Sequence, residues 1–399
     1  MRDNSARRDT LTTTLLDDQS VVQRILDHID KQTTDLGDQV WHEPVENYLS
    51  RERFAAEIEL LRRYPIPFCP SAALPENGSY IARDAAGVPL IAVRGSDGVV
   101  RAFRNACRHR GMQLADNSGC QKAFVCRYHG WTYGLDGRLR HVPHDYGFPA
   151  LDQDTRGLAP LPASELHGLV FVTQNDAAPP DANLESLPPM VPSRHKLRRT
   201  NEIEVKANWK IFAEGFLEGY HIRPLHRDTF YPVQFDNLNV VESFGRNSRI
   251  VFPYRRINKL REVPAAERTA DGFLTYVYHL FPNVMVVTFP TNIAIVILEP
   301  LATDRALVIT CTLTDRPADQ SETEAEVKRG EDFVNLGAIE DREVACAIQQ
   351  GLGSGANKFF EFGRFEMALG HFHRSLDAAL AKMGFADSIE GSPNESRSR

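Results

Sequence analysis

Two cysteines and two histidines in the first third of the chain are spaced to hold an iron–sulfur cluster. They occur in two short segments, NACRHRG and VCRYHGWTYG, which contain Cys107 with His109 and Cys126 with His129. Each segment offers one thiolate and one imidazole. A [2Fe-2S] cluster of the Rieske type needs this set, because two cysteines bind one iron and two histidines bind the other. We therefore predict that these four residues bind a [2Fe-2S] cluster that carries electrons.

A tetrahedral zinc ion is the alternative occupant, because two cysteines and two histidines can also surround zinc. Two features favour the cluster. Each segment is mixed, CxH and CxxH, whereas a Cys2His2 zinc site usually pairs two cysteines and then two histidines. Gly111 and Gly130 follow the two ligand pairs, as expected where backbone approaches a cluster closely and donates hydrogen bonds to its sulfurs. A zinc-stabilised interaction protein would give a colourless preparation.

A second candidate metal site lies in the segment NWKIFAEGFLEGYHIRPLHRDTF, which contains Glu218, His221 and His226. Glu218 and His221 are three residues apart, so on a helix they would share a face. Pro224 lies between the two histidines and is expected to break or distort the helix, which would let both imidazoles approach one metal ion. Two neutral histidines and one carboxylate form the facial triad of non-heme Fe(II) oxygenases. The alternative is an amphipathic helix with incidental histidines.

The third ligand of such a triad is expected in the acidic segment IEDREVACAIQQGLGSG. Glu340, Asp341 and Glu343 lie in this segment, and Asp332 lies a short distance before it. The spacing does not select among these four carboxylates.

The elements that must position the cluster differ from those around the second site. Residues 1–60 carry helical signals, with apolar residues at helical spacing from Val21 to Ile29 and an amphipathic segment that begins after Ser50. Residues 61–178 contain short β-like runs (LIAVRG, VVRAFRN, AFVCRY, LVFVTQ) separated by turn signals such as SDG and LDG. This pattern predicts a small antiparallel β domain, followed by a linker rich in Pro, Ala and Asp at 179–193.

The C-terminal half is predicted to be a separate α+β domain over residues 194–385. A helical stretch, NWKIFAEGFLEGYH, precedes runs with high β-branched content (NVMVVTFP, NIAIVILEP, ALVITCTL), and helices follow from about 319 to 383. Strands with flanking helices favour the α+β class. Polar residues 386–399 are predicted to form a flexible tail.

Composition excludes several classes of protein. A chain of 399 residues suggests about two to three domains, and its formal net charge of -7 argues against a nucleic-acid partner. We expect no membrane association and a cytoplasmic location, because no stretch approaches the ~18 apolar residues of a membrane span and the first residues lack the apolar core of a secretory signal. Six scattered cysteines are too few for a disulfide framework and suggest metal binding instead.

The run from NACRHRG to CRYHGWTYGLDG resembles the Rieske ferredoxin-like domain of the aromatic-ring-hydroxylating dioxygenase alpha subunits, a family of Rieske non-heme iron oxygenases. The resemblance implies that the cluster lies at the tips of two β-hairpin loops. It implies a helix-grip (START-like) catalytic domain, in which an antiparallel sheet curves over a long helix. It also implies that Asp341 completes the iron site with His221 and His226, because the surrounding segment is similar to the ED…Q.GL stretch of the family.

The resemblance also implies a role for Glu218. In the family, the cluster of one subunit lies near the iron of its neighbour in a head-to-tail trimer, and an acidic residue bridges a cluster histidine to an iron histidine. That residue is usually Asp; here it is Glu218, as in a branch that includes oxygenases acting on quaternary ammonium compounds such as carnitine. Glu218 is thus the expected catalytic bridge from His109 or His129 to His221. Gly215 departs from the family pattern, where many relatives have Asn.

The function implied by the resemblance is that of a terminal oxygenase component with two cofactors, a Rieske [2Fe-2S] cluster and a mononuclear Fe(II). It would use O2 and electrons from NAD(P)H, delivered by a reductase and possibly a ferredoxin, to hydroxylate or dihydroxylate a small aromatic substrate. The alternative is a monooxygenase that performs N- or O-demethylation or quaternary ammonium cleavage. We expect a homotrimer that depends on a partner for electrons, since no GxGxxG motif follows a predicted strand.

Another alternative is a pure electron carrier with an idle second domain, which would bind ~2 irons per chain, where the oxygenase binds ~3. If the chain is an oxygenase, its second domain must also contain an apolar substrate pocket. Residues that could line this pocket, or could equally be core, are Phe216, Phe281, Val286, Phe289 and Ile295.

Overall fold

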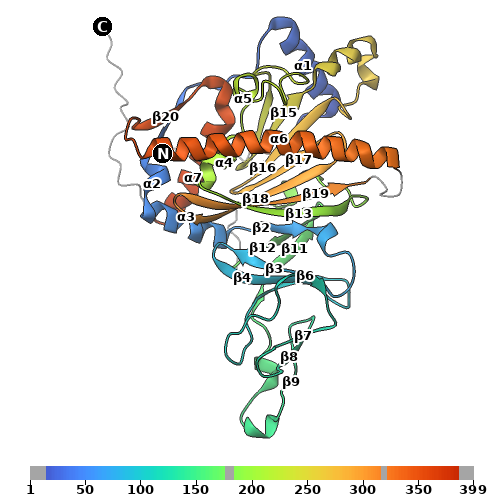
Figure 1. Cartoon of the computed structure of the whole chain (residues 1–399), viewed down its shortest axis with the longest axis vertical. Helices are drawn as coiled ribbons and strands as arrows, with labels where there is room; N and C mark the ends of the chain where they lie inside the picture. Colours follow the sequence, from blue (N-terminus) through green and yellow to red (C-terminus); the bar gives the residue numbers. More distant parts are fainter. Residues whose placement is uncertain (1–14, 176–183, 316–320, 386–399) are drawn as a thin grey trace, which may run out of the picture.

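The computed structural model describes residues 15–175, 184–315 and 321–385. A small β domain lies at one end of the long axis, and a larger domain of helices and sheet lies at the other (Figure 1). The predicted tail at 386–399 and part of the predicted linker at 179–193 lie outside the described residues. Among the described segments, none of the helices combines the length and apolar character that crossing a bilayer requires.

The predicted N-terminal helices are confirmed within the described part of residues 1–60. Helix α1 (Asp18–Lys31) buries its apolar face against the catalytic domain. Helix α2 (Glu46–Leu49) is short, and α3 (Arg51–Arg63) begins where Ser50 accepts a hydrogen bond from the Arg53 backbone N–H. This cap satisfies one of the free N–H groups of the first turn, which explains why the helix starts there.

The N-terminal β domain consists of antiparallel sheets, as the alternating runs predict. Its five-stranded sheet has the order β10 (Pro160–Leu161), β5 (Val100–Arg104), β4 (Val88–Arg94), β3 (Ser79–Ala85), β6 (Asn117–Cys120). A three-stranded sheet has the order β11 (Ala163–Leu166), β12 (Leu169–Val172), β2 (Ile66–Pro70). A second three-stranded sheet lies farther from the catalytic domain than β3 and β6, as Figure 1 shows, and has the order β7 (Ala123–Val125), β8 (Thr132–Gly134), β9 (Leu139–His141).

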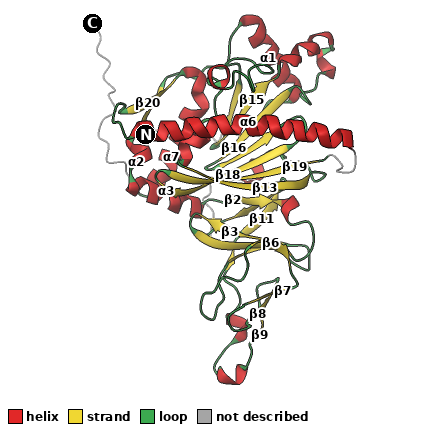
Figure 2. Cartoon of the chain, in the orientation of Figure 1, coloured by secondary structure: helices red, strands yellow, loops and turns green. Residues whose placement is uncertain are grey.

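The C-terminal domain is built on a seven-stranded antiparallel sheet, which confirms the α+β class. The strand order is β13 (Lys196–Val205), β19 (Arg305–Thr314), β18 (Ile293–Ala302), β17 (Val284–Thr288), β16 (Leu274–Leu280), β15 (Asn247–Pro253), β14 (Val240–Phe244). The long helix α6 (Ser321–Leu352) lies across this sheet, as Figure 2 shows. The other helices are α4 (Trp209–Glu214), α5 (Ile222–Leu225) and α7 (Met367–Lys382). A sheet with a long helix across it matches the expected helix-grip arrangement.

One pair of strands was not predicted. Strand β1 (Trp41–Pro44) pairs antiparallel with β20 (Phe359–Phe362), in a region where the sequence pattern indicated only helices. The two segments are more than 300 residues apart in sequence, and each is only four residues long. Such pairing depends on tertiary contacts, so local periodicity does not reveal it.

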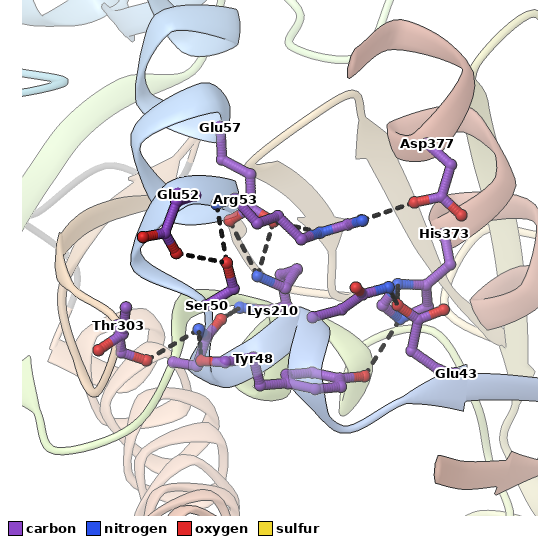
Figure 3. A network of polar contacts seen from close by, with 12 residues as sticks. Glu43, Tyr48, Ser50, Glu52, Arg53, Glu57, Lys210, Thr303, His373 and Asp377 are labelled. Carbon is purple, nitrogen blue, oxygen red and sulfur yellow. Dashed lines mark hydrogen bonds and ion pairs between the residues drawn. The ribbon is translucent and has the colours of Figure 1, made fainter. Parts of the chain in front are cut away.

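Buried charges connect the N-terminal helices to the catalytic domain (Figure 3). The Glu57 carboxylate of α3 accepts hydrogen bonds from Lys210 Nζ at 2.8 Å, Trp209 Nε1 at 3.0 Å and Arg53 Nε at 3.2 Å. Arg53, Glu57 and Lys210 are each at most 1% exposed. Burial lowers the pKa of Lys210, although Glu57 opposes the shift. Glu57 therefore compensates Lys210 and shares Arg53 with Asp377, whose Oδ1 lies 2.6 Å from Arg53 Nη2.

Replacing Glu57 with alanine is expected to lower the free energy of unfolding by about 3–5 kcal/mol, because it leaves buried charge without a partner. Glu59→Ala is the matched control on the same helix. Glu59 is 38% exposed and pairs with Arg63 at 2.9 Å, so its loss is expected to cost less than about 1 kcal/mol. Urea unfolding followed by circular dichroism measures both. Equal effects of the two substitutions would contradict the role assigned to Glu57.

Candidate metal centres

The two cluster segments form matching loops. In the first, the Cys107 N–H donates to the Met112 carbonyl and the Gly111 N–H donates to the Cys107 carbonyl, both at 2.8 Å. The second repeats this pattern, from Cys126 to Trp131 at 2.8 Å and from Gly130 to Cys126 at 2.9 Å. The two glycines have φ values of +78° and +75°, a region that favours glycine, which explains why glycine follows each ligand pair.

The loops bring the four predicted cluster residues together. Cys107 and Cys126 are buried, and the rings of His109 and His129 lie 4.7 Å apart. His109 Nδ1 is buried without a hydrogen-bond partner among the described residues, as expected for an atom that binds iron. Burial and the nearby His129 lower the pKa of His109, which favours the neutral imidazole that metal binding needs.

Zinc fits this arrangement less well. A tetrahedral ion would draw all four ligand atoms close together. In the described part of the chain, His221, His226 and Asp341 are the group whose ligand atoms lie within 4.8 Å of one another, and the four cluster residues do not form such a group. The two cysteines are buried and the two histidines are less buried, so the cysteine pair and the histidine pair suit two irons better than one zinc.

Tyr133 contacts the cysteine side of this centre. Its hydroxyl lies 3.3 Å from Cys107 Sγ and accepts a hydrogen bond from the Arg108 N–H at 2.9 Å. A cluster-bound thiolate carries no proton, so the hydroxyl must be the donor to sulfur. Hydrogen bonds to the sulfurs raise the reduction potential, because they stabilise the more negative reduced state.

Tyr133→Phe is therefore expected to lower the reduction potential of the cluster by roughly 40 mV, the equivalent of ~1 kcal/mol for one electron. The measurement is a spectroelectrochemical titration of the purified protein. Tyr80→Phe is the control, because Tyr80 lies in the same domain core but bonds to Gln121 and not to a cluster residue. If the reduction potential does not change in Tyr133→Phe, the Tyr133 hydroxyl does not raise the potential of the cluster.

The second candidate centre brings His221, His226 and Asp341 together. Asp341 Oδ1 lies 3.0 Å from His226 Nε2 and 3.8 Å from His221 Nε2. His226 is fully buried, and its Nε2 has no hydrogen-bond partner among the described residues. Two histidine nitrogens and a carboxylate oxygen that converge in this way match the donor set of a mononuclear iron.

Neighbouring carboxylates fix the tautomers of both histidines. Glu218 Oε1 accepts a short hydrogen bond from His221 Nδ1, and Glu340 Oε2 accepts one from His226 Nδ1 at 2.7 Å. A proton held at Nδ1 leaves a lone pair on Nε2, the nitrogen that faces Asp341. Burial lowers the pKa of His221, but Glu218 and Asp341 outweigh it and raise the pKa. The arrangement therefore directs both Nε2 atoms at one point.

The local backbone differs from the expected helix. Glu218 and His221 lie in the connection between α4 and α5, so the prediction that they share a helix face was wrong. Glu218 Oε2 instead accepts hydrogen bonds from the Tyr220 and His221 N–H groups, which turns the chain. Helix α5 is a single turn that contains Pro224, whose missing N–H is harmless in a first turn. His221 and His226 flank this turn, which brings both rings to the same side.

The structure separates the four candidate carboxylates. Asp341 faces the two histidine Nε2 atoms, whereas Glu340 contacts the opposite side of the His226 ring. Glu343 is exposed, and Asp332 pairs with Lys328 at 2.9 Å. The sequence pattern gave no signal for the contact of Glu340 with His226, which depends on the packing of α6 against the α5 segment.

A cavity of about 300 Å³ lies between the sheet and helices α4 and α6. Phe216 and Phe289 line it as predicted. Val286 and Ile295 do not: both are fully buried in the core, and the flanking positions on their strands line the cavity, because side chains alternate between the two faces of a sheet. Phe281 is also core, packed on Tyr64. For these three residues the core alternative holds.

Comparisons with known proteins agree with this architecture. Residues 64–152 match the Rieske [2Fe-2S] domain, and residues 193–382 match the catalytic domain of the ring hydroxylating alpha subunit. The oxygenase subunit of carnitine monooxygenase from Acinetobacter pittii is 32% identical over 232 residues, which cover 54% of this chain and 62% of the relative. The oxygenase subunit of glycine betaine monooxygenase from Chromohalobacter salexigens is 36% identical over 159 residues, 38% of this chain and 36% of the relative.

Solved structures share the fold over nearly the whole chain. A quaternary ammonium Rieske monooxygenase superposes with a TM-score of 0.73 at 21% identity, covering 91% of this chain and 98% of the other. Naphthalene 1,2-dioxygenase from Rhodococcus superposes with a TM-score of 0.69 at 19% identity, covering 91% and 98%. The aligned segments of the curated relatives span less than two thirds of their length.

A cluster-binding β domain joined to a helix-grip domain with its own metal centre defines a class of iron-dependent oxidoreductases. The chain belongs to the Rieske non-heme iron oxygenases, in the family of ring-hydroxylating alpha subunits. The cofactors of this family are a Rieske [2Fe-2S] cluster and a mononuclear iron. The unpartnered His109 Nδ1 and His226 Nε2 fit these two groups.

Proposed function

We propose that this chain is the oxygenase component of a multicomponent system that takes electrons from NAD(P)H through a reductase, with or without a ferredoxin. The observation that carries the proposal is the convergence of His221, His226 and Asp341 in a chain that also contains a Rieske domain. When bound, the cluster supplies single electrons and the ferrous ion activates dioxygen. We assign the cluster to Cys107, His109, Cys126 and His129, and the iron to the three converging residues.

The chain's own residues prepare the iron site. Glu218 and Glu340 accept hydrogen bonds from Nδ1 of the two histidines, which orients both rings with Nε2 toward the site. Thr229 donates a hydrogen bond to the same Glu340 oxygen at 2.7 Å, which fixes this carboxylate. The site therefore needs little rearrangement when metal binds.

We infer that the substrate is a quaternary ammonium compound, the alternative in our sequence analysis, and not an aromatic compound. The support comes from the relatives, whose names give carnitine and glycine betaine as substrates. Glu218 at the bridge position points to the same branch. Oxygen inserted at a carbon attached to the nitrogen makes the C–N bond labile, which would release an amine. Ring hydroxylation is the competing function. It is favoured by the large oxygenase component of the 2,4-dinitrotoluene dioxygenase system from Burkholderia, which is 34% identical over 194 residues, and by the likeness of fold to naphthalene dioxygenase.

The position of the two centres supports electron transfer between subunits. The loop between β7 and β8, which carries Cys126 and His129, lies in the lower part of Figure 1, and α5 lies in the upper half, beyond the large sheet. A cluster and an iron of one chain are thus far apart. We therefore propose a head-to-tail homotrimer, in which Glu218 connects its own His221 to a cluster histidine of the neighbour.

The test is consumption of O2 and NAD(P)H by the purified protein with a matched reductase, screened over quaternary amines, aromatic acids and aryl ethers. Amine release from a quaternary ammonium compound with matched NAD(P)H consumption is the expected result. Metal analysis is expected to give ~3 irons per chain. Zinc in the protein, or no iron beyond the cluster, would overturn the proposal, and turnover of aromatic compounds alone would overturn the substrate class.

A further inference from the structure

The cavity between the sheet and helices α4 and α6 is positively charged. Arg199 of β13 and Arg342 of α6 line it, and no Asp or Glu is among its lining residues in the described part of the chain. Neither arginine side chain forms an ion pair or hydrogen bond with a described residue, although many other arginines of this protein do. Two guanidinium groups without an acidic partner are suited to bind an anion, because the planar donor fork matches a carboxylate.

The rest of the lining is aromatic, aliphatic and neutral polar. Phe212 of α4 and Phe216, two residues beyond the end of α4, lie edge to face at 5.7 Å between ring centroids, and Phe289 directly follows β17. Aromatic faces accept either an apolar group or a trimethylammonium group, which they attract through the ring quadrupole. A wholly cationic ligand would meet these rings but would also meet two uncompensated arginines. The cavity therefore favours a ligand that carries a negative group beside its apolar or cationic end.

Two segments that line the cavity also carry residues of the candidate iron site. Phe216 precedes Glu218 by two residues, and Arg342 follows Asp341 directly on α6. Ala338, which also lines the cavity, is three residues before Asp341, so the two lie on neighbouring positions of one helix face. A ligand in the cavity thus contacts the helix that carries the carboxylate of the triad.

We propose that this cavity takes a substrate with a carboxylate group, which Arg199 and Arg342 bind, and that this group distinguishes accepted substrates from the corresponding alcohols. The proposal rests on the proposed function, since it takes this cavity as the substrate site of the oxygenase. For quaternary ammonium compounds, it selects betaines over choline. Their trimethylammonium groups are the same, and only the acidic group differs.

The experiment compares matched acids and alcohols by isothermal titration calorimetry with the anaerobic iron-loaded protein. The two pairs are glycine betaine with choline, and benzoate with benzyl alcohol. We expect the acid to bind at least about tenfold more tightly than its alcohol in each pair that binds, as for a charged hydrogen bond. The double variant R199Q/R342Q is expected to lose this preference. R51Q changes an exposed arginine of α3 that does not line the cavity, and is expected to keep the preference. Iron content and thermal unfolding of each variant verify that the metal site and fold are intact.

The two pairs separate this proposal from the proposed function. Binding of benzoate over benzyl alcohol, with no binding of betaine or choline, would support the arginine pair and overturn the quaternary ammonium assignment. Tighter binding of choline than of betaine would overturn the arginine pair and leave that assignment intact. Binding of neither acid, or a preference for acids that survives in R199Q/R342Q, would also overturn the carboxylate proposal.

Discussion

Replacing Asp341 with alanine is expected to abolish turnover, with a loss greater than about 100-fold, while the visible spectrum of the [2Fe-2S] cluster stays unchanged. Loss of an outer partner of a metal ligand alone can cost ~10- to 100-fold, and loss of a ligand costs more. Asp341 Oδ1 is the oxygen that faces both histidine Nε2 atoms. Iron content should fall from ~3 to ~2 per chain, because the cluster is held by a separate domain. His221→Ala is expected to act in the same way.

The α6 helix provides graded controls for this substitution. Glu343 is exposed and only two residues from Asp341, so Glu343→Ala is expected to keep full turnover and full iron content. Glu340→Ala removes the acceptor of the His226 Nδ1 proton and is expected to reduce turnover ~10- to 100-fold. Turnover and iron analysis of the three variants test the order Asp341, Glu340, Glu343. Full activity in Asp341→Ala, or a loss in Glu343→Ala equal to it, would overturn the ligand assignment.

The motifs could be predicted from the sequence wherever the chemistry is local. The four candidate cluster residues lie within two short loops, and the glycines that follow them have a backbone conformation that few other residues adopt. The same holds for the Ser50 cap of α3 and for apolar periodicity in α1. In these cases the residues that determine the structure are neighbours in sequence.

Features that depend on distant packing could not be predicted. The spacing could not distinguish Asp341 from Glu340, because the rotation of α6 against the α5 segment decides which carboxylate faces the two histidine Nε2 atoms and which contacts His226 Nδ1. Val286 and Ile295 were candidates for the cavity, yet the choice of sheet face depends on which side α4 and α6 cover. Pairing of β1 with β20 likewise needs the folded domain.

Replacing Glu218 with alanine is expected to slow electron transfer from cluster to iron by ~10- to 100-fold or more while both metals are retained. Within the chain, Glu218 already holds His221 Nδ1, and its side chain is 12% exposed, so it can reach a neighbouring subunit. Stopped-flow measurement of cluster reoxidation in the presence of substrate and O2 reports the transfer directly. Asp228→Asn, an exposed change in the segment after His226, is the control and should leave the rate unaltered. If the cluster is reoxidised at the same rate in Glu218→Ala as in the unchanged protein, Glu218 does not connect the cluster to the iron.

Mixed oligomers test which chain's Glu218 serves electron transfer, and iron analysis of each mixture verifies that the metal is retained. Cys126→Ser should disable the cluster of a subunit, and Asp341→Ala should disable its iron, so each variant alone is expected to be inactive. If electrons pass between subunits, co-refolded or co-expressed mixtures regain activity, because an intact cluster in one chain then faces an intact iron in the next. Adding Glu218→Ala to the chain with the intact iron should remove this recovered activity, whereas adding it to the chain with the disabled iron should not. If the recovered activity is the same whichever chain carries Glu218→Ala, then Glu218 acts on fold or assembly and not on electron transfer.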